Sequence, residues 1–160
     1  MPAKTNSKKL APTAQLRSLI DRFDAKNQKF IRSVRAALLK RFPTANELVY
    51  DYSSSLVIGY SPSENGIESI VAISARADGV WLYFNRGKQL PDPKKLLSGT
   101  QKLTRFMQLE SARQLKHPDV EALIAAAIEL SKVPLPSKGK GQLIIKTFKA
   151  DKRPRPRAKK

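Results

Sequence analysis

A hairpin in the middle of the sequence constrains the fold more than any other feature. The pair Asp78-Gly79 stands between two apolar runs, 70–75 and 80–84, and an Asp-Gly pair so placed is the strongest short-range indication of a tight antiparallel turn. The second run reads VWLYF, a composition typical of a strand that is buried on both faces or nearly so. The centre of the chain therefore predicts an antiparallel sheet rather than parallel strands joined by helices.

Further short apolar runs predict the rest of the sheet. We expect strands over 47–52, 55–60 and 67–75 before the hairpin turn, and another over 104–109 after a connector rich in glycine and proline. A late run, 142–148, has the composition of a loosely tethered edge strand. The regular spacing of these runs indicates a sheet of about five strands.

Segments with helical periodicity precede and follow the predicted strands. Apolar residues at helical spacing predict a long N-terminal helix over about 13–42, with a break near Asp24 left open. A closing helix is expected from Pro118 to about Lys132, because proline suits a first helical turn and acidic residues follow it. The predicted fold is α+β: an antiparallel sheet of about five strands with a long N-terminal helix and C-terminal helices.

Positive charge is concentrated at the two ends of the chain. The sequence has 31 lysines and arginines against 13 acids, a net charge of +18, and two thirds of that net charge lies in 1–10 and 134–160. Such a field favours polyanions over free cations. The expected organisation is a disordered basic arm over 1–12, an α+β domain over 13–133, a linker with a candidate edge strand over 134–148, and a disordered basic tail over 149–160.

The sequence shows no catalytic machinery. There is no cysteine, which excludes disulfides, thiolate metal sites and cysteine nucleophiles. The single histidine, His117, stands at a helix start beside proline, so we interpret it as a capping or surface residue. Phosphate-binding, dinucleotide-binding and zinc-protease motifs do not occur, and the acids are scattered. We predict no catalytic residue, no metal ligand and no enzyme activity.

The sequence also predicts where the protein resides. No apolar run approaches the length of a membrane helix, and the N-terminal residues lack the apolar segment of a secretory signal. We therefore expect a cytoplasmic protein without a membrane partner.

Aromatic residues on the central strand suggest a ligand site. Trp81 and Tyr83 are expected on the face opposite Val80, Leu82 and Phe84. Cross-strand packing is the ordinary explanation of such aromatics, and the alternative is a ligand cleft roofed by a helix, with an anion as the ligand. The candidate ligand-binding residues are Trp81, Tyr83, Arg86, Lys102 and Arg105.

Two basic segments have alternative interpretations. The basic side of the N-terminal helix, which includes Arg32 and Arg35, is either a solvated face or a face for polyanions. The C-terminal tail is either a solubilising segment or a non-specific attachment to nucleic acid, since alternating arginine and proline keep a chain extended along phosphates. The candidate nucleic-acid residues are Lys149, Lys152, Arg153, Arg155, Arg157, Lys159 and Lys160.

The connector after the central strand carries a family resemblance. Its elements, in order, are Asn85-Arg86-Gly87, Leu90-Pro91-Asp92-Pro93, Leu96 to Lys102 and Thr104-Arg105-Phe106. This order resembles the YdhG-like family of small bacterial domains of unknown function, over roughly residues 16–130. The resemblance implies a small antiparallel sheet flanked by helices. Some members are described as frataxin-like iron chaperones, which for those members implies iron held by carboxylates.

Three hypotheses of function follow. The first is a non-enzymatic YdhG-like domain that binds a ligand or acts like a chaperone. The second is a nucleic-acid-associated protein held non-specifically through its basic tails. The third is an iron-binding, frataxin-like chaperone, which the resemblance implies although the basic composition and scattered acids provide no acidic ridge. No other cofactor is expected, and the sequence does not indicate an oligomeric state.

Overall fold

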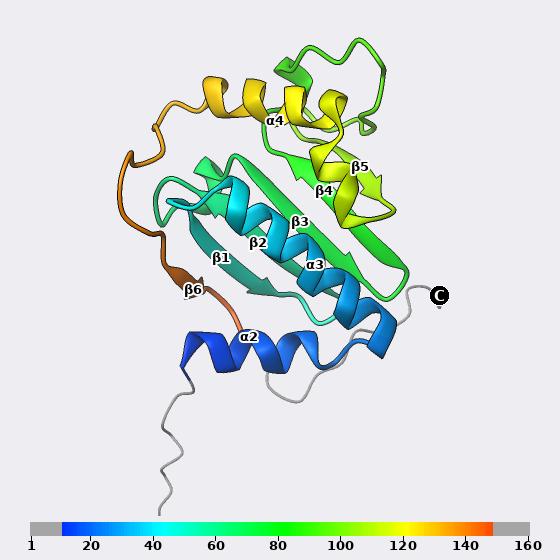
Figure 1. The fold of residues 1–160 in the computed structure, drawn as a ribbon, viewed down its shortest axis with the longest axis vertical. Helices are drawn as coiled ribbons and strands as arrows, with labels where there is room; N and C mark the ends of the chain where they lie inside the picture. The colour runs from blue at the N-terminus through cyan, green and yellow to red at the C-terminus, as the bar shows by residue number, and fades with distance from the viewer. Residues whose placement is uncertain (1–10, 149–160) are drawn as a thin grey trace, which may run out of the picture.

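An open sheet of six strands forms the frame of residues 11–148, the part of the chain that the computed structural model describes (Figure 1). The strand order is β5-β4-β3-β2-β1-β6. Neighbouring strands are antiparallel except β6, which runs parallel to β1. The strands are β1 (Asn46–Asp51), β2 (Ser55–Ser61), β3 (Val71–Arg76), β4 (Gly79–Phe84), β5 (Arg105–Leu109) and β6 (Leu143–Ile145).

The α+β class and the antiparallel character of the sheet are confirmed, and the late apolar run supplies a sixth strand beyond the five expected. The third predicted strand begins later than expected, because residues 66–68 form a short 3₁₀ helix before β3. The expected N-terminal arm and C-terminal tail lie outside the described residues, except that Pro12 opens the first helix.

The central hairpin is present, with its turn one residue earlier than the Asp-Gly pair predicts. Arg76 pairs with Gly79, so the two turn residues are Ala77 and Asp78. Gly79 is the first residue of β4 and has a φ of +154°, a conformation that favours glycine. An added Cβ there would lie 3.2 Å from the ring of Trp81. The turn chemistry thus fixes the register that places the residues around Trp81.

The N-terminal helical region consists of two helices, α2 (Pro12–Ile20) and α3 (Ala25–Arg41). Asp24 causes the break by capping α3: its carboxylate accepts a hydrogen bond of 2.8 Å from the backbone N–H of Asn27. A single long helix is therefore not formed, and α2 packs beside β6 while α3 crosses the sheet (Figure 1).

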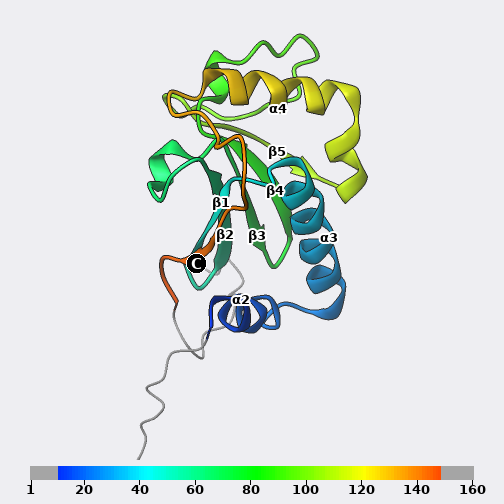
Figure 2. The ribbon, with the colours of Figure 1, turned by 60° about the vertical axis from the view of Figure 1, so that its left-hand side comes forward.

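The C-terminal helical region begins with a 3₁₀ helix, η3 (Ala112–Lys116), and continues as α4 (Pro118–Leu130). His117 is the N-cap of α4, and its Nδ1 accepts from the backbone N–H of Asp119 at 3.1 Å. The interpretation of His117 as a capping residue is confirmed. Figures 1 and 2 show α4 across one end of the sheet, above the end of α3.

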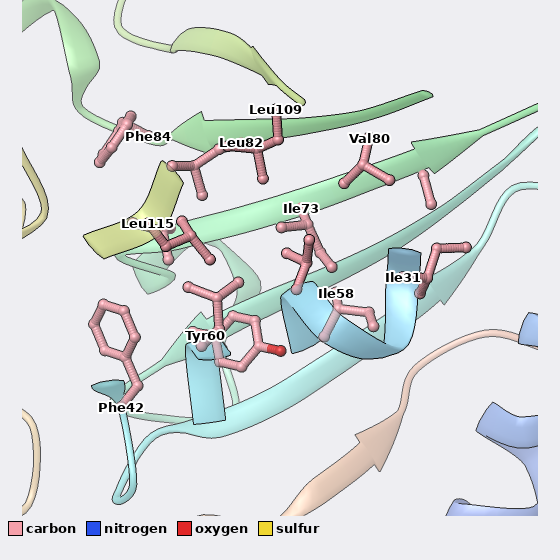
Figure 3. Close-up of a cluster of buried hydrophobic side chains, with 14 of the residues drawn as sticks. Ile31, Phe42, Ile58, Tyr60, Ile73, Val80, Leu82, Phe84, Leu109 and Leu115 are labelled. Atoms are coloured by element: carbon pink, nitrogen blue, oxygen red, sulfur yellow. The ribbon is translucent and has the colours of Figure 1, made fainter. Parts of the chain in front are cut away.

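The two faces of the sheet have different environments. Residues that alternate along β2, β3 and β4, including Ile58, Ile73 and Leu82, are fully buried and belong to one apolar core. Figure 3 shows these side chains beside Ile31 of α3 and Leu115 of η3. In Figure 2 α3 lies on one side of the strands. The other side of the sheet, which we call the open face, carries no α-helix of the described chain.

Candidate functional site

The open face carries the aromatic residues that the sequence singles out. Along β4, Val80, Leu82 and Phe84 are buried in the core, whereas Trp81 and Tyr83 alternate with them and are half-buried. The prediction that Trp81 and Tyr83 share the opposite face is confirmed. The expectation that β4 is buried on both faces or nearly so is met in full on one face only, because Trp81 and Tyr83 on the other face are half-buried. The helix expected to roof the aromatic pair is also missing from this face of the described chain.

Arg76 is the charged residue that contacts this aromatic pair. Its guanidinium carbon lies 4.0 Å from the centre of the Trp81 ring, close enough for a cation–π interaction. The register explains the contact, since Arg76 pairs with Gly79 and so reaches the residue two places further along β4. A guanidinium plane stacked on an indole presents its own outer face and its N–H edge to a ligand.

The guanidinium of Arg76 also has an unused donor. Its Nε is buried and has no hydrogen-bond partner, and it is the only such buried side-chain nitrogen or oxygen in residues 11–148. A buried donor without an acceptor costs about 1 to 3 kcal/mol. Because Nε is buried, the guanidinium has to shift on the indole ring before a carboxylate or phosphate oxygen of a ligand can reach this donor and remove that cost.

A second aromatic pair lies next to Trp81. The rings of Tyr83 and Phe106 are 5.1 Å apart between centroids and are inclined by 33°. The two residues are direct cross-strand partners, and in the adjoining row Gln108 is the partner of Trp81. The edge of the open face formed by β4 and β5 therefore presents aromatic surface with an exposed amide beside it.

Small residues adjoin the aromatic edge. Ala72 and Ser74 of β3 pair with Tyr83 and Trp81 respectively, and Gly59 of β2 follows in the next strand. Because these side chains are short, β2 and β3 form a low floor between aromatic residues on either side. On the far side of this floor Tyr50 and Tyr52 stack with their rings 6.0 Å apart and nearly parallel. Burial, and secondarily the neighbouring Tyr52, raises the pKa of the Tyr50 phenol above its usual value.

The loop between β2 and β3 closes one end of this floor. Ser69 approaches Gly59 so closely that an added Cβ on the glycine would lie 2.7 Å from the serine hydroxyl oxygen. The side chain of Asn85 donates to the carbonyls of Gly66 and Ile67, and Lys146 donates from Nζ to the Glu64 carbonyl at 2.8 Å. The opposite end, where Arg76 lies, is the end at which β3 finishes and β4 starts.

The three other predicted ligand residues lie away from Trp81. Arg86, Lys102 and Arg105 are placed where β4 ends and β5 begins. The guanidinium of Arg105 donates to the carbonyls of Gln101 and Thr104. Arg105 also pairs with Phe84, on the core side of the alternation, and not with Trp81 or Tyr83. Arg86 donates to Gln89 at 2.9 Å and lines a separate cavity of about 260 Å³ beside α4.

Sequence reasoning did not select Arg76 or Phe106. Arg76 was detectable in principle, because the hairpin register places it near Trp81 once the turn is assigned to Ala77 and Asp78. Phe106 was not, since the long connector between β4 and β5 hides their register. The family resemblance, through its Lys102 and Arg105 positions, favours Arg105 instead.

Several arginines of the N-terminal helices contact acids of the chain itself. Arg35 makes a two-point contact with Glu47, with both nitrogen–oxygen distances 2.8 Å. Arg32 contacts Asp21 at 3.2 Å, and Arg41 contacts Glu121 at 2.8 Å. The pairs of Arg35 and Arg41 join α3 to β1 and α4, so these two arginines are engaged within the fold.

The described residues also bear on metals and membranes. Within 11–148, histidine, aspartate and glutamate form no group of three or more that could hold a metal ion. No helix in the same range combines the length and apolar character needed to cross a bilayer. Iron binding therefore stays an implication of the family resemblance alone.

Comparison of the chain with family models, with curated proteins and with solved structures finds no match.

Proposed function

We propose that this domain is a non-enzymatic binding module that holds, on its open face, an anionic ligand with a flat aromatic part. The single observation that carries the proposal is the Arg76–Trp81 stack, in which a buried guanidinium Nε has no partner. The stack offers an aromatic surface and an unused cationic donor side by side. These are the two features that a flat anion needs.

The positive net charge of the described residues favours an anionic ligand over a cationic one. Residues 11–148 contain 21 lysines and arginines against 12 acids, a net charge of +9. Arg76 on β3 and Lys146 after β6 are the basic residues at opposite sides of the open face. A cationic ligand would meet this field unfavourably. The YdhG-like resemblance agrees with a binding role and remains part of the proposal.

Tryptophan fluorescence tests the proposal directly. Trp81 is the only tryptophan in the chain, so its emission reports on the stack alone. Deoxyadenosine monophosphate and phenyl phosphate, two flat phosphates, should quench or shift that emission in a saturable way, and Arg76→Gln should weaken both effects. Arg86→Gln is the matched control, because Arg86 lies in another cavity. Emission that neither phosphate alters would overturn the proposal.

A second candidate function rests on the composition of residues 149–160. Seven basic residues and one acid give this segment a net charge of +6, enough for non-specific attachment to phosphates. In the full chain, changing Arg153, Arg155 and Arg157 to glutamine should reduce the salt dependence of nucleic-acid binding. An unchanged salt slope would identify the segment as a solubilising one.

A further inference from the structure

The open face has two aromatic stacking positions rather than one. Trp81 and Tyr83 are two residues apart on β4, so their side chains leave the same face about 6.6 Å apart along the strand. Each has a distinct neighbour: Arg76 lies over Trp81, and Phe106 lies beside Tyr83. A ligand with a single ring occupies one position, whereas a ligand with consecutive rings on a flexible backbone occupies both.

We infer that the open face binds single-stranded nucleic acid, with one base stacked on the outer face of the Arg76 guanidinium above Trp81, the next base at Tyr83, and a backbone phosphate oxygen received by the N–H edge of Arg76. This inference rests on the proposed function and names its ligand class. Every base has an aromatic face, so a sheet that displays aromatic side chains can hold a single strand without reading its sequence. In a duplex those faces are covered by neighbouring base pairs.

The residues around the aromatic positions suit such a ligand. Gln108, the exposed cross-strand partner of Trp81, carries an amide that can donate to and accept from base edges. Ala72 and Ser74 beside the aromatic edge are short and themselves buried, so the ligand contacts are made by the aromatic rings and by Arg76. The net charge of +9 within residues 11–148 complements the charge of a phosphate backbone.

The test measures how affinity depends on ligand length and strandedness. Trp81 emission is titrated in the full chain with deoxyadenosine monophosphate, with a short oligodeoxyadenylate, and with the same strand annealed to oligothymidylate. The single strand should bind at least about fivefold more tightly than the monophosphate, since stacking of one further base strengthens binding by about 5- to 150-fold. The duplex should bind more weakly than the single strand.

Variants locate the second stacking position. Tyr83→Leu keeps an apolar side chain but removes the ring, so it should reduce the preference for the oligonucleotide over the monophosphate by about fivefold or more. Tyr52→Leu is the matched control: Tyr52 is 52% exposed and follows β1, three strands away from β4. Circular dichroism establishes that the Tyr83 variant is folded.

The outcomes separate this inference from the proposed function. If the monophosphate quenches Trp81 and the oligonucleotide binds no more tightly, the proposed function stands and the inference is overturned. If neither ligand acts on Trp81, both are overturned. Oligonucleotide binding that leaves Trp81 emission unchanged and depends only on residues 149–160 would also overturn the inference. Equal losses in the Tyr83 and Tyr52 variants would overturn the placement on β4.

Discussion

The hydroxyl of Tyr60 donates a hydrogen bond of 2.8 Å to the carboxylate of Glu47, and both side chains are buried beneath α3. The same carboxylate accepts two hydrogen bonds from Arg35 of α3. A glutamate that points into an apolar core is thereby fully engaged by one helix and one neighbouring strand. The helix and the sheet are joined at this point by a charged contact as well as by apolar packing.

Replacing Glu47 with glutamine should destabilise the protein substantially. The change leaves the Arg35 guanidinium beside a neutral amide in a largely buried place, and breaking a buried ion pair in this way typically costs about 3 to 5 kcal/mol. Because the Arg35 side chain is 27% exposed, water compensates for part of the loss, and we expect the free energy of unfolding to fall by about 2 to 3 kcal/mol. Urea denaturation measures the change.

The exposed Glu64 supplies the control for that experiment. Its backbone carbonyl accepts from Lys146, and this contact survives a change of side chain, so Glu64→Gln should leave the unfolding midpoint nearly unaltered. Equal midpoints for the Glu47 and Glu64 variants would show that the buried contact contributes nothing to stability.

The pH dependence of stability should show the effect of the raised pKa of the Tyr60 phenol. Burial raises the pKa of its phenol well above the ordinary value near 10, and the adjacent negative charge of Glu47 acts in the same direction. The unfolded chain therefore loses this proton at a lower pH than the folded protein does. The stability contributed by the neutral phenol is fully present below pH 10 and falls as the pH rises above it, at about 1.4 kcal/mol per pH unit.

Tyr60→Phe provides the comparison, because it removes the titrating group and keeps the ring. Below pH 10 the variant should be less stable than the wild type by about 1.5 to 3 kcal/mol, the contribution of a hydrogen bond to a charged acceptor. Above pH 10 the difference should shrink. Denaturation of both proteins in urea across this range measures the difference, and a gap that stays constant would mean that the phenol titrates normally in the folded protein.

The sequence predicted the elements of this fold better than their pairing. Period-two alternation and turn residues located the first five strands because both are local properties of the chain. The parallel pairing of β6 with β1 joins segments almost a hundred residues apart, and no local pattern encodes it. The division between α2 and α3 depends on one side chain, Asp24, whose capping contact outweighs the continuing helical periodicity.

The difference between local patterns and strand pairing also explains which residues of the candidate site could be predicted. Trp81 and Tyr83 were assigned to one face by alternation within a single strand, which needs no knowledge of neighbours. The family resemblance points to Arg105 as the charged member of the site, yet the pairing of Arg105 with Phe84 places it on the core side of the alternation. Arg76 takes that position instead, because a hairpin register brings it to Trp81.

The capping role of Asp24 leads to a further prediction. Asp24→Ala should lower the free energy of unfolding by about 1 kcal/mol, since it removes the acceptor for the Asn27 N–H at the start of α3. Asp24→Asn is the matched control, because the asparagine side-chain oxygen caps a helix almost equally well. Urea denaturation of the two variants makes the comparison. Equal losses would attribute the effect to the charge of Asp24 rather than to its hydrogen bond.

The docking of β6 should depend on a single glycine. An added Cβ at Gly141 would lie 1.6 Å from the backbone oxygen of Ala45 and 2.9 Å from the backbone nitrogen of Asn46, so the chain before β6 has to move away from β1 in Gly141→Ala. The amide of Lys146, which donates to the Val49 carbonyl at 2.8 Å, should then exchange with solvent about tenfold faster or more, whereas the amides of β3 should keep their protection. Lys140→Ala, an exposed neighbour, controls for the substitution itself. Hydrogen exchange followed by NMR measures these amide exchange rates. Unchanged protection of the Lys146 amide in the Gly141 variant would show that β6 still pairs with β1 when the preceding chain has moved.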